Sequence, residues 1–508
     1  MRAISVRPVP PSPQARPPPV QQPGAKPRPA WPLRGAWPLV PVLAVQAALS
    51  LRLIWSTTAF QDEALYLRAG HLIWAHWLHG ARIPGFASYF SGAPVLYPPI
   101  AAAADSVGGL HVARLLSLGL MLAVTTLLWG TTARLYGRRA ALLATALFAT
   151  LAGTQFLGAL ATYDALALSL LALAAWLAVR SADCDLRARL ALLASAGTVL
   201  ALADAVTYAT VLFTPVVIAV AGLAAWRRPG GRGALGSALA VAASWLLTAA
   251  AGAGLAGRQY WAGFTATILD RPVSTAAVTT VAQRAYAWTG LIALLAVLGA
   301  LLAARARDGP RYLPAVLAAA ALLAPAEQAR LHTVVSLQKH VVLGAWFAAI
   351  AAGYALARLS RVAPGRGWAP IMAIPIAAST LFGSLGQASA LARAWPNSAQ
   401  LISVLRPALR AYPGHYLAED YDVEAYYLRA EAGWRRWSST YYFSYPGTRS
   451  GAAAYRVAIA RHYFSLVILD FRDTTATDRE ITADMAQAGG YYVLTRAGAF
   501  TIWATDGR

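Results

Sequence analysis

Apolar stretches recur along the chain from Trp37 to about Gly386, and each is roughly 18–23 residues long, enough to cross a hydrocarbon core of about 30 Å as an α-helix. Charge is scarce, because 13% of the residues are charged whereas 58% are hydrophobic. The sequence therefore predicts a polytopic α-helical membrane protein with about 11 transmembrane helices. We place the spans at about 38–56, 111–131, 139–157, 163–180, 189–204, 207–226, 234–256, 286–304, 312–326, 340–357 and 369–387.

The net charge of +22 indicates how the chain is oriented in the membrane. Basic residues cluster in every second loop, which is typical of cytosolic loops under the positive-inside rule. This places the N-terminus in the cytosol and the C-terminal region outside the plasma membrane, and it argues against nucleic-acid binding. The loop clusters are Arg134/Arg138/Arg139, Arg180/Arg187/Arg189, Arg227/Arg228/Arg232, Arg305/Arg307/Arg311 and Arg358/Arg361/Arg366.

Three regions follow from these patterns. Residues 1–37 are basic and Pro-rich, which predicts a disordered cytosolic tail. Residues 38–387 form the transmembrane domain, with a long first outer loop at 57–110. Residues 388–508 alternate helical and strand patterns, which predicts a small extracytoplasmic α/β domain. In it we expect helices at Ala399–Ala411, about Asp422–Ala430 and Asp478–Ala488, and strands at His415–Ala418, Ser465–Phe471, Tyr491–Thr495 and Ala499–Ala504.

The acidic pair Asp62-Glu63 lies just after the first span, in the long outer loop. Carboxylates at a membrane boundary are costly and usually functional, and so are long loops in compact folds. Asp164 opens the fourth span at its outer end, where a helix start favours a carboxylate, so capping alone is an alternative. Other acids map to the same side, where they can equally end helices or face water: Asp105, Asp204, Asp270 and Glu327.

The order of these motifs resembles that of the GT-C superfamily of lipid-carrier-dependent glycosyltransferases. The chain is most similar to the bacterial branch related to protein O-mannosyltransferases and aminoarabinose transferases (glycosyltransferase family 39-like), over about residues 38–508. Tyr97 replaces the histidine of a His-Pro-Pro element that is common in relatives, so no role of that histidine is carried over. The motifs are Asp62-Glu63, Tyr97-Pro-Pro99, Thr162-Tyr-Asp164 and Ser336-Leu-Gln-Lys-His340.

The resemblance implies transfer of a sugar from a polyprenyl-phosphate donor to an extracytoplasmic acceptor, which is a cell-envelope glycan, a lipid or a protein. Transfer in this superfamily usually inverts the anomeric carbon. Asp62 is the expected general base. Glu63 is expected to orient Asp62 or to bind the acceptor. Asp164 is expected to share the catalytic work with Asp62, with one carboxylate acting as base and the other binding a metal ion or a hydrogen-bond partner.

Cationic side chains at the outer interface are expected to bind the donor phosphate. Lys339 is the first candidate, with His340 beside it, and Arg258 and Arg330 are weaker ones. Snorkelling or lipid-headgroup contacts are the alternative roles. The expected substrate-lining aromatics are Tyr66, Tyr97 and Tyr260, for which an ordinary aromatic belt is the alternative.

Two further questions stay open in the sequence. Asp62 and Glu63 could hold an optional Mg²⁺ or Mn²⁺ ion through oxygen ligands, whereas the histidines His71, His76 and His79 alternate with tryptophans in a way typical of an interfacial helix. A transporter or flippase of lipid-linked sugar precursors is the alternative function. The acids lie at the outer ends of the spans and no internal repeat is visible, which favours the transferase.

Overall fold

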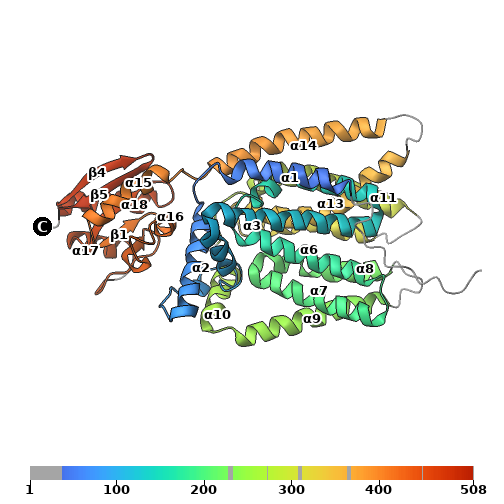
Figure 1. Cartoon of the computed structure of the whole chain (residues 1–508), viewed down its shortest axis with the longest axis horizontal. Coiled ribbons are helices and arrows are strands. Elements are labelled where there is room, and N and C mark those ends of the chain that lie inside the picture. Colours follow the sequence, from blue (N-terminus) through green and yellow to red (C-terminus); the bar gives the residue numbers. More distant parts are fainter. Residues whose placement is uncertain are drawn as a thin grey trace, which may run out of the picture. The chain divides into compact units, whose positions relative to one another are not determined.

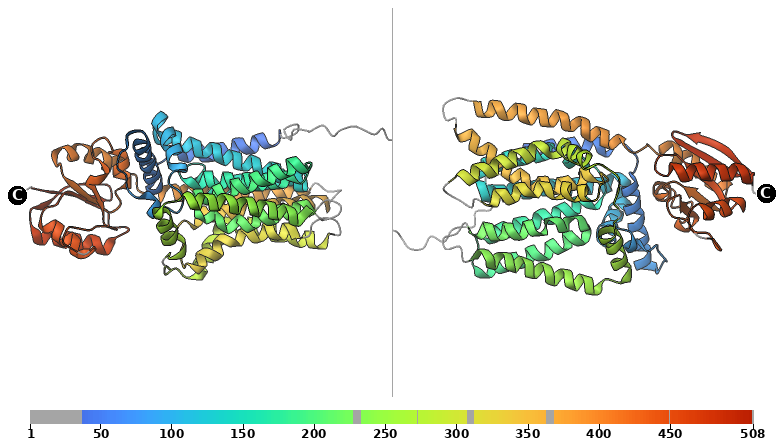
Figure 2. Two further views of the ribbon diagram at one scale, coloured as in Figure 1. Left: turned by 90° about the horizontal axis from the view of Figure 1, so that it is seen from below. Right: turned by 180° about the vertical axis from the view of Figure 1, so that it is seen from behind.

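The computed structural model describes residues 37–506 apart from 227–232, 272, 307–311, 363–367 and 449. The expected disordered tail, residues 1–37, therefore lies almost wholly outside the described residues. Pro38–Arg508 form one compact unit. This unit holds a helical membrane region, whose long helices run side by side in Figures 1 and 2, and a mixed β/α region that follows it in the chain.

The membrane region contains long helices and a few short ones. Their bounds are α1 Leu39–Ile54, α2 Gln61–His79, η1 Phe86–Ser88, α3 Tyr97–Tyr136, α4 Arg138–Thr150, α5 Ala152–Leu157, α6 Tyr163–Ser181, α7 Leu186–Val206, η2 Tyr208–Phe213, α8 Thr214–Trp226, α9 Gly233–Leu255, α10 Arg258–Phe264, η3 Thr265–Leu269, α11 Val278–Arg305, α12 Tyr312–Arg330, α13 Leu337–Val362 and α14 Trp368–Arg393.

Eight helical segments in the described part of the chain are long and apolar enough to cross a membrane. The prediction of a polytopic helical membrane protein is therefore confirmed, whereas the expected total of about eleven spans is only partly matched. Three expected spans correspond to α1, which has 16 residues, to the interrupted pair α4 and α5, and to α14. The eight candidate spans are α3, α6, α7, η2 with α8, α9, α11, α12 and α13.

The expected span 139–157 is not one continuous helix. α4 ends at Thr150, Leu151 is extended with φ −60° and ψ 139°, and α5 then runs for six residues. The break leaves the Thr150 carbonyl without its helical partner, and the side-chain amide of Gln155 donates to it at 2.8 Å. Here a local side-chain hydrogen bond replaces a backbone one, as buried polar groups require.

α3 begins at Tyr97, well before the span expected at 111–131. Pro98 and Pro99 occupy its first turn, where proline costs no hydrogen bond and its fixed φ suits a helix. The helix is interrupted at Gly108 and Gly109, and Gly109 has a φ of 69° that residues with a Cβ rarely adopt. The end of the expected outer loop and the span that follows it therefore form one kinked helix.

The C-terminal region is a five-stranded sheet in the order β2-β1-β3-β5-β4, flanked by helices in Figure 1. β1 pairs in parallel with β2 and β3, and β5 is antiparallel to β3 and β4. The predicted helices and strands are confirmed to within a few residues, whereas the three-residue β2 and α17 are additional. The bounds are α15 Ala399–Ala411, β1 His415–Ala418, α16 Asp422–Tyr427, η4 Trp434–Arg436, β2 Trp437–Ser439, α17 Ala452–Ala460, β3 Phe464–Leu469, α18 Thr475–Ala488, β4 Tyr491–Ala497 and β5 Phe500–Thr505.

α13 is the most enclosed of the eight candidate spans, because 83% of its most apolar stretch is buried. Glycines allow its neighbours to approach closely. A Cβ on Gly344 would lie 2.5 Å from the Ala320 carbonyl oxygen of α12, and one on Gly353 would lie 2.4 Å from the Ala140 carbonyl oxygen of α4. Small residues at such crossings let helix backbones meet in a membrane, and they fix the helix that begins at Leu337.

Candidate active site

The ammonium group of Lys339 lies between two carboxylates. Its Nζ donates a hydrogen bond to Oδ2 of Asp62 and lies 3.8 Å from Oδ2 of Asp164. The side chains of Lys339 and Asp164 are buried, whereas that of Asp62 keeps 36% exposure. The structure thus brings together three residues that the sequence analysis singled out, and one of the two acids remains accessible.

Each of these three residues lies in the first turn of a helix. Asp62 is in the first turn of α2 and Asp164 in that of α6, where the helix dipole favours negative charge. Lys339 lies in the first turn of α13, where the dipole disfavours a cation. Ser336, with a φ of 60°, leads into this turn, and its carbonyl accepts from the N–H of Lys339 at 3.0 Å. The two acids therefore compensate for an unfavourable cation position.

Tyrosine rings flank the charged group. The ring of Tyr66 lies 4.7 Å from that of Tyr163 and meets that of Tyr97 edge-on at 6.3 Å. Burial, together with the neighbouring Tyr163 and Asp62, holds the pKa of Tyr66 well above its usual range. Its hydroxyl therefore stays protonated and can donate a hydrogen bond. Tyr163 was not among the expected lining residues, although it is part of the Thr162-Tyr-Asp164 motif.

Glu63 belongs to a separate, fully buried network with Arg114. Its Oε1 accepts from Arg114 Nε at 2.8 Å and from the Ala161 N–H at 2.7 Å. Its Oε2 accepts from Arg114 Nη2 at 2.7 Å and from the Phe60 N–H at 2.9 Å. Both oxygens are occupied by protein donors, which leaves neither of them free for an acceptor or a metal ion. Of the roles expected for Glu63, this geometry fits the orienting one, because Glu63 fixes the start of α2 beside Asp62.

The remaining expected phosphate-binding residues differ in their surroundings. His340 follows Lys339, and its Nδ1 accepts from the Gln328 amide at 2.9 Å. Arg330 is 63% exposed and donates to both carboxylate oxygens of Glu327. Arg258 is exposed at the start of α10, and Tyr260, expected to line the substrate, is half-buried two residues later. Of all the expected phosphate-binding residues, only Lys339 contacts Asp62 and Asp164, and His340 follows it in the same helical turn.

The other acids on the expected outer side either bond to neighbouring side chains or, as their alternative interpretation states, face solvent. Asp105 accepts from the Tyr426 hydroxyl at 2.5 Å and contacts Nε2 of His71 at 2.6 Å. Both oxygens of Asp204 are engaged, by Thr210, Thr214 and Trp245. Asp270 is exposed. None of these contacts requires a ligand.

The C-terminal region contacts the helix that carries Asp62. Helix α16 packs against α2. Arg68 of α2 forms an ion pair with Asp422, and its guanidinium lies 5.1 Å from the ring centre of Tyr421. The Tyr427 hydroxyl accepts from the Ala59 N–H at 2.8 Å. The C-terminal region thus contacts α2 both just before its first residue, at Ala59, and within the helix, at Arg68. The position of Asp62, which lies between these two contacts, therefore depends on the C-terminal region.

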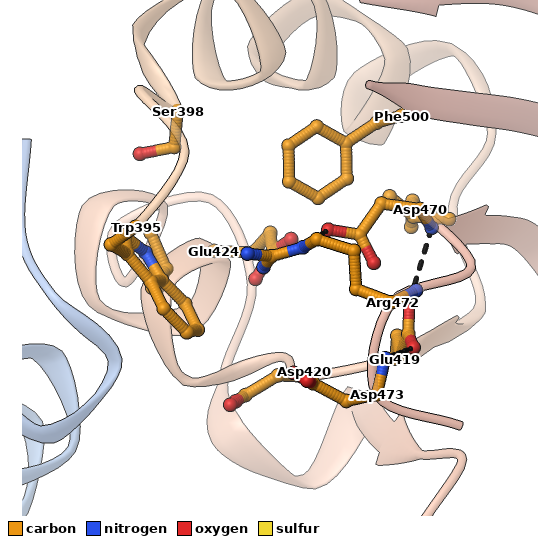
Figure 3. Close-up of a pocket in the computed structure, with 11 residues that line it drawn as sticks. Trp395, Ser398, Glu419, Asp420, Glu424, Asp470, Arg472, Asp473 and Phe500 are labelled. Carbon is orange, nitrogen blue, oxygen red and sulfur yellow. Dashed lines mark hydrogen bonds and ion pairs between the residues drawn. The ribbon is translucent and has the colours of Figure 1, made fainter. Parts of the chain in front are cut away.

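A small acidic pocket lies where β1 leads into α16. Its volume of about 20 Å³ accommodates roughly one water molecule. Figure 3 shows Arg472 extending from the turn after β3 among the acidic side chains of this pocket. The Arg472 guanidinium lies 4.9 Å from the ring centre of Trp395. The charged lining residues are Glu419, Asp420, Glu424, Asp470, Arg472 and Asp473.

The acids of this pocket differ in their protonation. Burial opposes ionisation of Glu419, but hydrogen bonds from Asp470 and from backbone N–H groups of the turn outweigh it and lower its pKa to about 2. Burial raises the pKa values of Asp420 and Glu424 well above their usual range, and each has a buried oxygen without a hydrogen-bond partner. The charge of Asp62 also raises the pKa of Asp420.

The expected metal site does not fit the side chains that are present. Among the described residues, no group of three or more His, Cys, Asp or Glu is placed to hold a metal ion. The Lys339 ammonium already contacts the Asp62 carboxylate, where a metal cation would have to bind. Both carboxylate oxygens of Glu63 accept hydrogen bonds from Arg114 and from backbone N–H groups. The described side chains around Asp62 therefore do not form a site for Mg²⁺ or Mn²⁺.

The Glu63–Arg114 pair predicts a specific pattern of stability. Arg114→Met leaves a buried carboxylate without its counter-ion, which costs about 3–5 kcal/mol. Adding Glu63→Met removes that charge, so the double variant regains part of the loss. Thermal unfolding in detergent micelles measures the effect, with the exposed Arg284→Met as a matched control. A double variant no more stable than Arg114→Met would contradict the assignment.

Asp478, in the first turn of α18, predicts a pH dependence. It is fully buried, and burial, reinforced by Glu419, raises its pKa to about 7. An unfolded Asp has a pKa of about 3.9, so the folded form loses stability as pH rises from about 4 to about 7. Asp478→Asn should therefore reduce the fall in melting temperature between pH 5 and pH 8. The exposed Glu480→Gln should leave it unchanged, and equal pH profiles for wild type and Asp478→Asn would refute this.

Comparison with known proteins shows the fold. The sequence matches no protein-family model and no curated protein. ArnT from Cupriavidus metallidurans in the apo state superimposes with a TM-score of 0.63 at 14% identity, over 93% of this chain and 98% of that one; a second ArnT structure is bound to undecaprenyl phosphate. AglB, the oligosaccharyltransferase of Archaeoglobus fulgidus, in complex with an inhibitory peptide and a dolichol-phosphate, gives 0.55 at 15% identity, over 92% and 74%. The chain thus has the fold of the GT-C lipid-carrier glycosyltransferases.

Proposed function

We propose that this protein is an integral-membrane glycosyltransferase that moves a sugar from a polyprenyl-phosphate donor to an extracytoplasmic acceptor, with inversion at the anomeric carbon. The observation that carries the proposal is the buried Lys339 ammonium held between Asp62 and Asp164 at three helix starts. The fold shared with ArnT and AglB supports it. Ionisable groups that converge at a membrane boundary in this way are costly and mark a functional site.

Lys339 is suited to the donor phosphate. Its ammonium is buried, and a fixed positive charge in a water-poor site strongly stabilises the negative charge that develops on a leaving phosphate. Asp164, also buried, keeps Lys339 in place from the other side. Arg330 already shares its guanidinium with Glu327 and is the weaker candidate for this role.

Asp62 is suited to the acceptor. It is the more exposed of the two acids, so an acceptor hydroxyl can reach it. Binding of the donor phosphate to Lys339 competes with the Asp62 ion pair and frees the carboxylate to act as a base. The acceptor oxygen then bonds to the anomeric carbon, the bond from that carbon to the phosphate oxygen breaks, and the acceptor proton passes to Asp62. Polyprenyl phosphate leaves with its new charge beside Lys339.

The test is transfer by the purified full chain in lipid nanodiscs. Release of polyprenyl phosphate is measured from a panel of radiolabelled polyprenyl-phosphate sugars with cell-envelope extract as acceptor. Loss of the base should lower turnover in Asp62→Asn by at least about 100-fold. The exposed outer-side acid variant Asp270→Asn should be unaffected.

Two outcomes would contradict the proposal. Equal turnover by wild type and Asp62→Asn would remove Asp62 from the reaction. Tight binding of a lipid-linked sugar without turnover on any donor, together with its movement between bilayer leaflets, would instead indicate a transporter or flippase.

A further inference from the structure

The carboxyl ends of three parallel strands meet at one edge of the C-terminal sheet. Glu419 follows β1, Thr440 follows β2 and Asp470 follows β3. The Thr440 hydroxyl ties these turns together, because it donates to the Glu419 carbonyl at 3.3 Å and lies 2.5 Å from the Thr474 hydroxyl. In open α/β sheets, ligands bind outside the carboxyl ends of the strands.

A groove opens at this edge beyond β2. Its volume is about 480 Å³, which is within the size of sites for small ligands. The described lining residues combine aromatic rings with hydroxyl groups, and none of them carries a charge. They are Thr440, Tyr441, Tyr442, Phe443, Ser444, Ser450, Gly451, Ala452, Tyr455 and Thr477.

Two of the aromatic residues that line the groove, Tyr441 and Tyr442, are exposed. The side chain of Tyr442 is 87% exposed and that of Tyr441 45%, and their ring centres lie 6.2 Å apart at 33°. Phe443 packs instead on Tyr455, whose hydroxyl donates to the Ser439 carbonyl at 2.9 Å. The inner wall is therefore packed, whereas the outer wall presents the exposed rings of Tyr441 and Tyr442. Exposed aromatic surface of this kind marks an interaction site.

The chemistry of the lining selects a ligand class. A sugar ring offers an apolar C–H face that stacks on tyrosine and hydroxyl groups that hydrogen-bond to Ser, Thr and Tyr. A phosphate or an acidic peptide would require Lys or Arg, which the described lining does not contain. The lining therefore fits a neutral saccharide.

The groove is linked to the helix that carries Asp62 through the turn after β1 and helix α16. Thr440, which lines the groove, donates to the Glu419 carbonyl at 3.3 Å, and the chain leads from Glu419 into α16, whose Asp422 pairs with Arg68 of α2. Helix α16, which follows Asp420, packs on α2. A ligand in the groove therefore lies on the same edge of the sheet as the contact with the helix of Asp62, separated from Asp62 by the acidic turn.

We propose that this groove binds a neutral oligosaccharide and that the acceptor is a glycan held here at a distance from its reacting end. The acceptor role rests on the proposed transferase function, whereas the binding site itself does not. Energy from a remote part of a substrate positions the reacting part, so the groove would select glycans long enough to pass the acidic turn and reach Asp62.

The test uses the full chain in nanodiscs and immobilised neutral oligosaccharides, namely linear arabinan, galactan and mannan fragments. Loss of a stacking ring in Tyr442→Ala should weaken binding by about tenfold, or about 1.4 kcal/mol, whereas Tyr442→Phe keeps the ring and the affinity. Tyr492→Ala, which removes a 43% exposed tyrosine of β4, is the matched control. Asp62→Asn should bind glycans normally even if it transfers nothing.

The outcomes separate the two proposals. Absence of binding to every neutral oligosaccharide, equal binding by Tyr442→Ala and wild type, or preference for an extended peptide along the edge strand β2 would overturn the saccharide site. Glycan binding that depends on Tyr442, without sugar transfer from any donor, would support the site and refute the acceptor role. With transfer present, a KM for the glycan acceptor that Tyr442→Ala leaves unchanged would also overturn that role.

Discussion

The ion triad of Asp62, Asp164 and Lys339 is the interaction on which the rest of the candidate site depends. Each buried charge is costly unless it is paired, and the cation sits at a helix start where it is disfavoured. The triad therefore holds only while α2, α6 and α13 keep their relative positions. Close glycine contacts hold α13 against α12 and α4, so the position of Lys339 depends on the packing of the membrane region.

The ion pair between Glu63 and Arg114 gives the two acids of the Asp62-Glu63 motif different roles. Both carboxylate oxygens of Glu63 accept hydrogen bonds from Arg114 and from backbone N–H groups, and these bonds fix the first turn of α2. Asp62, one residue earlier, stays partly exposed and keeps a contact that a substrate can displace. On the other side, the Arg68–Asp422 pair joins α2 to the C-terminal region. A catalytic group positioned by packed neighbours in this way is preorganised for reaction.

Much of this arrangement could be predicted from the sequence, for identifiable reasons. Length and hydropathy predict the spans, and strand and helix periodicity predicts the C-terminal elements. The partner of Glu63 could not be predicted, because Arg114 lies far along the chain and only the fold brings the two residues together. Arg114 itself carried a signal, since a single arginine inside the expected span 111–131 demands a buried partner. The break at Leu151 depends on a side-chain hydrogen bond, and β2 is too short for a periodic pattern.

The most direct test of this account is a cryo-EM structure of the full chain in nanodiscs with a polyprenyl-phosphate sugar bound. The account predicts that the phosphate contacts the Lys339 ammonium, that Asp164 retains Lys339, and that Asp62 is released toward the acceptor side. A phosphate bound elsewhere, such as at Arg258, with Lys339 still paired to Asp62, would contradict it.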